Sequence, residues 1–375
     1  MSGIYIHIPF CRQACHYCNF HFSTSLRHRS QMVDAILQEA ALRVQYLPTN
    51  ALQTLYLGGG TPSLLPVSDL ERIFDQLSRL FSWPEDAEIT LEANPDDLSP
   101  DYLAGLRHYT PVNRLSIGIQ SFFSEDLTWM HRAHDAGMAH KAIEAALKYR
   151  FTDLTIDLIY GIPTSSDERW QENVNMALDY GIPHLSCYGL TVEPRTALDH
   201  FVRKGIAPSV DEEASVRQFE FLMDRMQAAG YEHYEISNFA MPGRYARHNT
   251  SYWQGKPYLG LGPSAHSYNG KDRHWNIANN ALYLDAIRQS TLPLEGENLT
   301  SSQKYNEYVM TGLRTQWGCS LSALAGLGAE WPDYFQEQAR AFLASGHILQ
   351  VAETFTLTRS GKLMADYIAS ELFAD

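Results

Sequence analysis

The chain has 375 residues and carries 43 acidic against 29 basic side chains, a formal net charge of −14 at pH 7. A fold of this size buries roughly three quarters of its unfolded surface and needs no disulfide bonds, while the negative charge disfavours general binding to nucleic acid. No secretory leader and no apolar run of about eighteen residues is present. The sequence therefore predicts a soluble cytoplasmic protein without a transmembrane segment, which reaches a membrane only through partners.

Short β-rich runs alternate with amphipathic helical patterns from residue 2 to about residue 254. The β-rich runs are apolar on both faces, as strands of a parallel sheet covered by helices are. They predict six strands: Ile4–Ile8, Thr54–Leu57, Glu88–Ala93, Arg114–Gln120, Leu154–Tyr160 and Leu185–Thr191. Helical periodicity lies between them at 31–46, 68–81, 141–149, 166–180 and 212–229. These units predict an α/β fold, an incomplete (β/α)6 barrel over residues 1–255.

The pattern changes after residue 255. Gly, Asn and aromatic residues dominate 256–300, which we expect to be a connecting segment. Residues 301–375 show helices, a short strand and a last helix, which predicts a small winged-helix-like α+β domain at the C-terminal end. Acidic residues outnumber basic ones from Glu295 onward, so this domain is expected to pack against or recognise protein rather than DNA.

Three of the five cysteines, Cys11, Cys15 and Cys18, lie close together directly after the first predicted strand. A disulfide needs two thiols and a structural zinc ion is normally closed by four ligands. A [4Fe–4S] cube usually takes four cysteines, so three leave one iron open to a ligand. The spacing also admits a zinc site that His16 or His21 completes.

Polar residues and glycines follow the other predicted strands where each one ends. The sequence GGGTP follows the second strand, Glu92 and Asn94 end the third, Gln120 ends the fourth, and Asp157 interrupts the fifth. Carboxyl ends of parallel strands meet at one mouth of a barrel, where function concentrates. Consecutive glycines allow close backbone approach, and a carboxylate in an apolar strand needs a donor or a cationic ligand.

The segment CRQACHYC resembles the CxxxCxφC signature of radical S-adenosylmethionine (SAM) proteins, with Tyr17 as the aromatic residue. The segments YIHIPFC, LYLGGGTPSLL, EITLEANPDDL, RLSIGIQSF and IDLIYGIP are similar to the oxygen-independent coproporphyrinogen III oxidase family. The resemblance implies a [4Fe–4S] cluster on the three cysteines, an electron donor such as a flavodoxin or ferredoxin, and bound SAM. The implied SAM contacts are Tyr5, Tyr17, Gly59, Gly60, Thr61, Glu92, Gln120, Arg132 and Asp157; Gly189 and His266 lie in matching segments.

Two features separate the chain from the oxidases of that family. Phe20 stands where they carry a further cysteine, and the segment RHNTSYW resembles the HNxxYW motif of the haem chaperone branch, HemW. The motif implies haem contacts at His248, Asn249, Tyr252 and Trp253, because imidazole ligates haem iron and aromatic rings suit a porphyrin face. Propionate partners are expected among Arg244, Arg247 and Lys256. The alternative for His248 is a hydrogen-bonded residue of an aromatic core.

Together these features predict a haem chaperone that delivers haem to haem-dependent respiratory proteins, carries a [4Fe–4S] cluster and SAM, and lacks oxidase activity. The alternative is a coproporphyrinogen III oxidase or another radical SAM enzyme that acts on a tetrapyrrole. A zinc-stabilised module for protein interaction is a third hypothesis, and it requires the cysteines to be purely structural.

Overall fold

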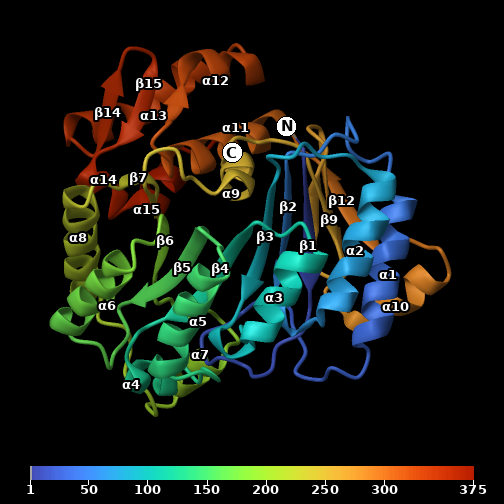
Figure 1. The fold of residues 1–375 in the computed structure, drawn as a ribbon. Helices are drawn as coiled ribbons and strands as arrows, with labels where there is room; N and C mark the ends of the chain where they lie inside the picture. The colour runs from blue at the N-terminus through green and yellow to red at the C-terminus, as the bar shows by residue number, and fades with distance from the viewer. Residues whose placement is uncertain (1) are drawn as a thin grey trace.

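The computed structural model describes residues 2–375 and is organised around one sheet of 12 strands (Figure 1). The strand order is β12-β11-β10-β9-β1-β2-β3-β4-β5-β6-β8-β7, which runs from one edge to the other and leaves the barrel open. The six predicted strands lie side by side in chain order and are parallel, which confirms the predicted architecture. Their bounds are β1 (Gly3–Ile8), β2 (Thr54–Gly59), β3 (Glu88–Ala93), β4 (Arg114–Gln120), β5 (Asp153–Tyr160) and β6 (His184–Gly189).

Helices pack against the sheet and enclose a continuous apolar core that includes Ile4, Ile6, Leu55 and Leu57. The sequence missed the helix at Pro100, although Ser99 caps it by accepting a hydrogen bond from the N–H of Tyr102. No helix within residues 2–375 is long and apolar enough to cross a bilayer. The helices of this part are α1 (Arg29–Leu42), α2 (Val67–Leu80), α3 (Pro100–Tyr109), α4 (Ser124–Trp129), α5 (Ala136–Lys148), α6 (Asp167–Asp179), α7 (Ala197–Arg203) and α8 (Glu212–Ala228), with 3-10 turns η1 (Pro62–Leu64) and η2 (Pro95–Asp97).

Shorter strands extend the sheet on both sides. Beyond β6, the antiparallel strands β8 and β7 follow, and beyond β1 the sheet continues into β9, which is parallel to β1. Residues 256–300, expected to be a connecting segment, therefore form part of the main sheet. Short strands rich in Gly and polar residues carry no periodic signal, so this outcome was not visible in the sequence. The elements are β7 (Glu232–Glu235), β8 (Asn238–Ala240), α9 (Arg247–Trp253), β9 (Tyr258–Leu261), β10 (His266–Tyr268), β11 (Asp272–Asn276), α10 (Asn280–Arg288) and β12 (Leu294–Asn298).

A buried ion pair on α1 holds this extension in place. Arg43 Nη1 lies 3.0 Å from Glu39 Oε1 and donates a hydrogen bond of 2.9 Å to the carbonyl oxygen of Gly260. Glu39 Oε2 accepts hydrogen bonds from the N–H of Gly262 at 2.8 Å and from the hydroxyl of Tyr283 at 2.7 Å. Because both charges are buried and each also bonds to groups of the extension, the pair fixes the extension relative to α1.

The C-terminal residues form a second unit with its own apolar core around Tyr305, Val309, Phe335 and Phe355. It combines helices with the antiparallel sheet β13-β15-β14, and it lies at the end of the main sheet where β1 begins (Figure 1). The exact domain boundaries stay a prediction. The elements are α11 (Ser301–Leu313), β13 (Cys319–Ser320), α12 (Leu321–Leu327), α13 (Trp331–Ala344), β14 (Ile348–Val351), β15 (Thr354–Leu357), α14 (Arg359–Lys362) and α15 (Ala365–Glu371).

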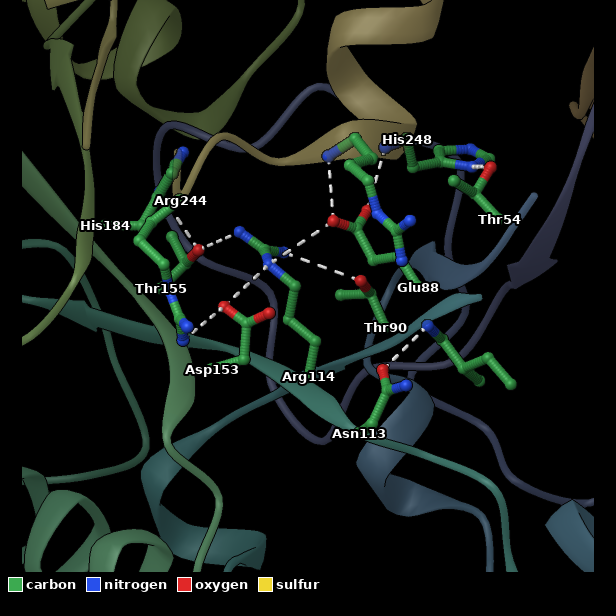
Figure 2. A network of polar contacts seen from close by, with 12 residues as sticks. Thr54, Glu88, Thr90, Asn113, Arg114, Asp153, Thr155, His184, Arg244 and His248 are labelled. Carbon is green, nitrogen blue, oxygen red and sulfur yellow. Dashed lines mark hydrogen bonds and ion pairs between the residues drawn. The ribbon is translucent and has the colours of Figure 1, made fainter. Parts of the chain in front are cut away.

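A buried polar network centred on Arg114 joins the starting ends of the parallel strands (Figure 2). Arg114 is 2% exposed, and its Nε lies 3.9 Å from Glu88 Oε2 and 3.8 Å from Asp153 Oδ1. The guanidinium also donates to the hydroxyls of Thr90 and Thr155. One cation thus connects β3, β4 and β5 inside the barrel.

The same network anchors α9. The Glu88 carboxylate accepts hydrogen bonds from the backbone N–H of Arg247 at 2.7 Å and of His248 at 2.8 Å, at the first turn of the helix. A carboxylate at this place satisfies free N–H groups and complements the helix dipole. The position of α9 therefore depends on Glu88, whose carboxylate lies beside the guanidinium of Arg114.

We expect Arg114→Ala to lower the free energy of unfolding by about 3–5 kcal/mol, because it leaves the carboxylate of Glu88 buried without its cation. Arg288→Ala is the matched control, since Arg288 pairs with Asp285 in an exposed contact, and such contacts contribute about 0–1 kcal/mol. Urea unfolding followed by circular dichroism measures both values. A loss below 1 kcal/mol for Arg114→Ala would show that the network is dispensable.

Candidate functional site

A cavity of about 470 Å³ opens at the carboxyl ends of the parallel strands, and the three clustered cysteines line it. All three are free thiols of intermediate burial. Cys11 Sγ accepts a hydrogen bond from the Thr61 hydroxyl at 3.6 Å, and Cys15 Sγ accepts one from Arg132 Nη1 at 3.4 Å. Burial raises the pKa of the Cys11 thiol to about 11 and also raises the pKa of Cys18. Metal binding would oppose this effect, because a coordinated thiol is deprotonated.

The two histidines proposed as zinc ligands make other interactions. His16 Nδ1 is hydrogen-bonded to the carbonyl oxygen of Trp129 at 3.0 Å, and His21 Nε2 to Asn280 Oδ1 at 2.8 Å. Neither histidine lines the cavity. Over residues 2–375, no three His, Cys, Asp or Glu side chains lie close enough to share one metal ion. A cube, whose irons each take a separate thiolate, fits the three cysteines better than a single zinc ion.

The glycine turn after β2 lies against the cysteine loop. A Cβ at Gly60 would stand 2.5 Å from the carbonyl oxygen of Phe10, and Gly59 has a φ of +106°. Gly60 N–H donates to the carbonyl oxygen of Ile8 at 2.9 Å. The glycine turn therefore makes the expected close backbone approach. Within the chain, it approaches the backbone that leads into Cys11.

Two carboxylates with raised pKa values face the same cavity. Glu92 accepts hydrogen bonds from the Tyr56 hydroxyl at 2.6 Å and from the N–H of Gly59 at 3.2 Å. Burial, together with the charge of Asp157, raises the pKa of Glu92 to about 7. Burial likewise raises the pKa of Asp157 to about 6. A cationic ligand would favour the ionised form of both groups and lower their pKa values.

Arg132 lines the same cavity as the two carboxylates and carries the positive charge of the site. Its Nη2 donates to Asn94 Oδ1 at 2.7 Å and to the carbonyl oxygen of Gly118 at 3.0 Å. Its Nε is buried and has no hydrogen-bond partner within the described residues. The guanidinium therefore keeps one donor available for an anionic ligand group.

Most of the positions implied for SAM binding line this cavity: Tyr17, Gly59, Gly60, Thr61, Glu92, Gln120, Arg132 and Asp157. Tyr5 does not line it, because its hydroxyl is hydrogen-bonded to His7 Nδ1 at 3.2 Å and its ring stacks on Tyr56 inside the barrel. Gly189 is part of the lining, whereas His266 is not.

The sequence analysis did not select Ser116 and Gly118, which also line the cavity. The signal was available, because alternate residues of a strand face the same side and Gln120 was already assigned to the mouth. Tyr188 and Glu193, from the end of β6 and the loop after it, offered no comparable pattern.

The HNxxYW segment lies at the other end of the barrel. Helix α9 begins beside the first residue of β1, where a Cβ at Gly3 would lie 3.2 Å from His248 Nδ1. The cysteine loop follows Ile8, the last residue of that strand. Six residues of strand span roughly 20 Å. The residues implied for SAM and those implied for haem therefore belong to two separate places.

His248 is fully buried in this structure. Its Nδ1 lies 2.8 Å from Thr54 Oγ1, its Nε2 lies 2.7 Å from the Tyr252 hydroxyl, and its ring stacks on Tyr56. Burial, with the nearby charge of Arg114, lowers the pKa of His248 to about 3. Both ring nitrogens have protein partners, as expected if His248 is a hydrogen-bonded residue of an aromatic core. Ligation of haem iron by His248 stays a prediction, and it would require Tyr252 to move away.

A second cavity, of about 860 Å³, adjoins the last turn of α9, and Tyr252, Trp253 and Lys256 line it. The other two proposed propionate partners, Arg244 and Arg247, do not line this cavity. Arg244 Nη2 lies 3.5 Å from Asp153 Oδ1, and Arg247 is paired with Asp86. Asn249 is also absent from the lining.

Comparisons with known proteins place these features in a family. Residues 5–177 match the radical SAM superfamily. The chain is 36% identical to the "Heme chaperone HemW" of Mycobacterium tuberculosis, over 99% of this chain and 94% of that protein. It is 32% identical to the protein of that name from Bacillus subtilis, over 98% of both chains. The chain belongs to the HemW family of radical SAM proteins.

Among solved structures, the fold is similar to that of coproporphyrinogen III oxidase (HemN) from Escherichia coli, described as a radical SAM enzyme. The TM-score is 0.85 over 100% of this chain and 90% of that chain. The sequence identity is 23%, so the similarity shows the fold alone. The HemW relatives and this fold confirm the resemblance that the sequence motifs indicated.

Radical SAM membership implies an iron–sulfur cluster and SAM, and the cavity at the cysteine loop fits both. Three thiols leave one iron of a cube open. An unpaired donor on Arg132 suits the carboxylate of SAM, and the carboxylates of Glu92 and Asp157 suit its positive groups. The individual contacts stay predictions.

We expect the HemW-family chain to bind SAM more tightly as the pH rises from 6 to 8. The pKa of Glu92 is raised to about 7, so its ionised fraction, and with it the attraction for a cation, increases about tenfold over this range. Calorimetric titration of the anaerobic, cluster-reconstituted protein measures the affinity. Glu92→Gln is the control that isolates this carboxylate from the titration of SAM itself. An identical pH slope in both proteins would contradict the assignment.

Proposed function

We propose that this protein is a haem chaperone, which binds haem near α9 and transfers it to haem-dependent proteins such as respiratory enzymes. The observation that carries the proposal is the HNxxYW helix of a HemW-family chain placed against a large aromatic cavity. Full-length relatives that bear the name heme chaperone support it.

The opposite end of the barrel would hold the cofactors. Cys11, Cys15 and Cys18 would hold a [4Fe–4S] cluster, and three thiolates would leave one of its irons for SAM. When reduced by a flavodoxin or ferredoxin, such a cluster supplies the electron that cleaves SAM. The chain's own contribution would be to orient SAM through Arg132 and the two carboxylates, which line the cavity together with the glycine turn.

An oxidase acting on coproporphyrinogen III is the second candidate, favoured by the fold and by the intact SAM cavity. Phe20 argues against it. This residue stands where the oxidases carry a cysteine, and it is 68% exposed at the lining of the cavity. An apolar ring at this place cannot replace a thiol in any chemical step.

One reconstituted anaerobic sample can separate the two functions. It is incubated with coproporphyrinogen III, SAM and a reductant, and its products are analysed beside a haem titration and a transfer assay to an apo-haem protein. Haem binding and transfer without formation of protoporphyrinogen is the expected result. Formation of protoporphyrinogen would establish the oxidase, and failure to bind haem would refute the chaperone.

We expect Cys11→Ser to remove the cluster while haem affinity changes by no more than about twofold, because Cys11 and the cavity beside α9 lie at opposite ends of the barrel and changes at distant positions act nearly independently. Iron and sulfide analysis and a haem titration measure the two properties. Cys187→Ala, a change in a buried cysteine outside the cavity, is the control that should keep the cluster. Joint loss of cluster and haem in Cys11→Ser would show that the two sites are one.

A further inference from the structure

We propose that the cavity between α9, the strands β10–β12 and α11 is the haem site, and that Lys256 and Lys304 bind the two propionates. This inference rests on the proposed chaperone function and gives it a location and a recognition chemistry. Lys304 lies on α11 in the C-terminal unit, so the site would join the two parts of the chain.

The size and position of the cavity suit a large planar ligand. Its volume of about 860 Å³ exceeds the 470 Å³ of the cavity at the cysteine loop, and it falls within the range of about 300–1,000 Å³ typical of ligand pockets. Its walls include the end of α9, the part of the sheet around Tyr268 and Arg273, and the face of α11 that carries Tyr308; residues of α12 and Phe373 complete the lining.

The charges around the cavity leave two cations without partners. Arg273 is paired with Glu297 and with Glu307, which are the acidic residues of the lining. Lys256 and Lys304 have no ion pair among the described residues. In a chain with a net charge of −14, two free ammonium groups at one cavity indicate a ligand with two anionic groups.

Aromatic side chains supply the apolar surface for a macrocycle. Tyr252 packs edge-on against Tyr258, with ring centroids 4.5 Å apart, and Trp253 and Phe373 extend the same lining. The indole Nε1 of Trp253 is buried and has no hydrogen-bond partner within residues 2–375. Flat rings of this kind favour a conjugated ring system that stacks or packs edge-on.

The proposed site is tested through the two lysines and not through a ligand of the haem iron. His248 Nε2 is hydrogen-bonded to Tyr252, so the phenol of Tyr252 stands between the imidazole and the cavity. If the propionates and the ring faces dominate binding, iron-free protoporphyrin IX should bind nearly as tightly as haemin. Haemin dimethyl ester, which lacks both charges, should bind much more weakly.

The experiment compares the parent protein with Lys256→Glu, Lys304→Glu and the double variant, titrated with haemin, protoporphyrin IX and haemin dimethyl ester. Each reversal should weaken haemin binding roughly tenfold, as loss of a charge-assisted contact does. Binding of the ester should stay the same in all variants. Lys148→Glu, on the exposed side of α5, has the same charge change away from the cavity and is the matched control.

Three results would overturn parts of the proposal in distinguishable ways. If the double variant binds haemin as tightly as Lys148→Glu, the cavity assignment fails and the chaperone function stands. If the ester binds the parent protein as tightly as haemin does, the carboxylate contacts fail, and this result needs no substituted protein. If the parent protein binds no haemin, the chaperone function fails as well.

Discussion

The contact between Arg114 and Glu88 determines how the two ends of this molecule are related. A cation enclosed by the barrel requires anionic partners, and Glu88 meets that need while it also holds the first turn of α9. The helix that bears the HNxxYW segment is thereby attached where the parallel strands begin. The cysteine loop follows the opposite end of β1. The network therefore holds α9 at the end of the barrel opposite to the cavity that the cysteines line.

The sequence predicted the parallel strands well because their burial on both faces is visible in the local sequence. Strands covered on both faces are apolar throughout, and the predicted bounds of β3 and β4 agree with the structure. The strands β9–β12 left no such trace. They are short, contain Gly and polar residues, and depend on contacts such as Arg43 with Gly260, which join residues 217 positions apart. The periodicity of the sequence gives no information on contacts between residues so far apart.

The candidate sites were predictable to different degrees. Cys11, Glu92 and Asp157 follow or interrupt strands whose ends converge, so topology alone brought them to one cavity. His248 was different. A motif indicates which residues matter, but it does not show that Thr54 and Tyr252 occupy both ring nitrogens. The place of Lys304 in the lining of the second cavity could not be predicted either, because the packing of α11 beside the sheet cannot be read from composition.

The place of β1 in the sheet has a consequence for biosynthesis. This strand lies between β2 and β9, and β9 ends only at Leu261. During translation β1 is made before β9, so one of its edges stays unpaired until the roughly 250 residues between the two strands have also been made. An uncovered edge invites pairing with other nascent chains. The strand that leads into the cysteine loop therefore reaches its final pairing only after β9 has been made.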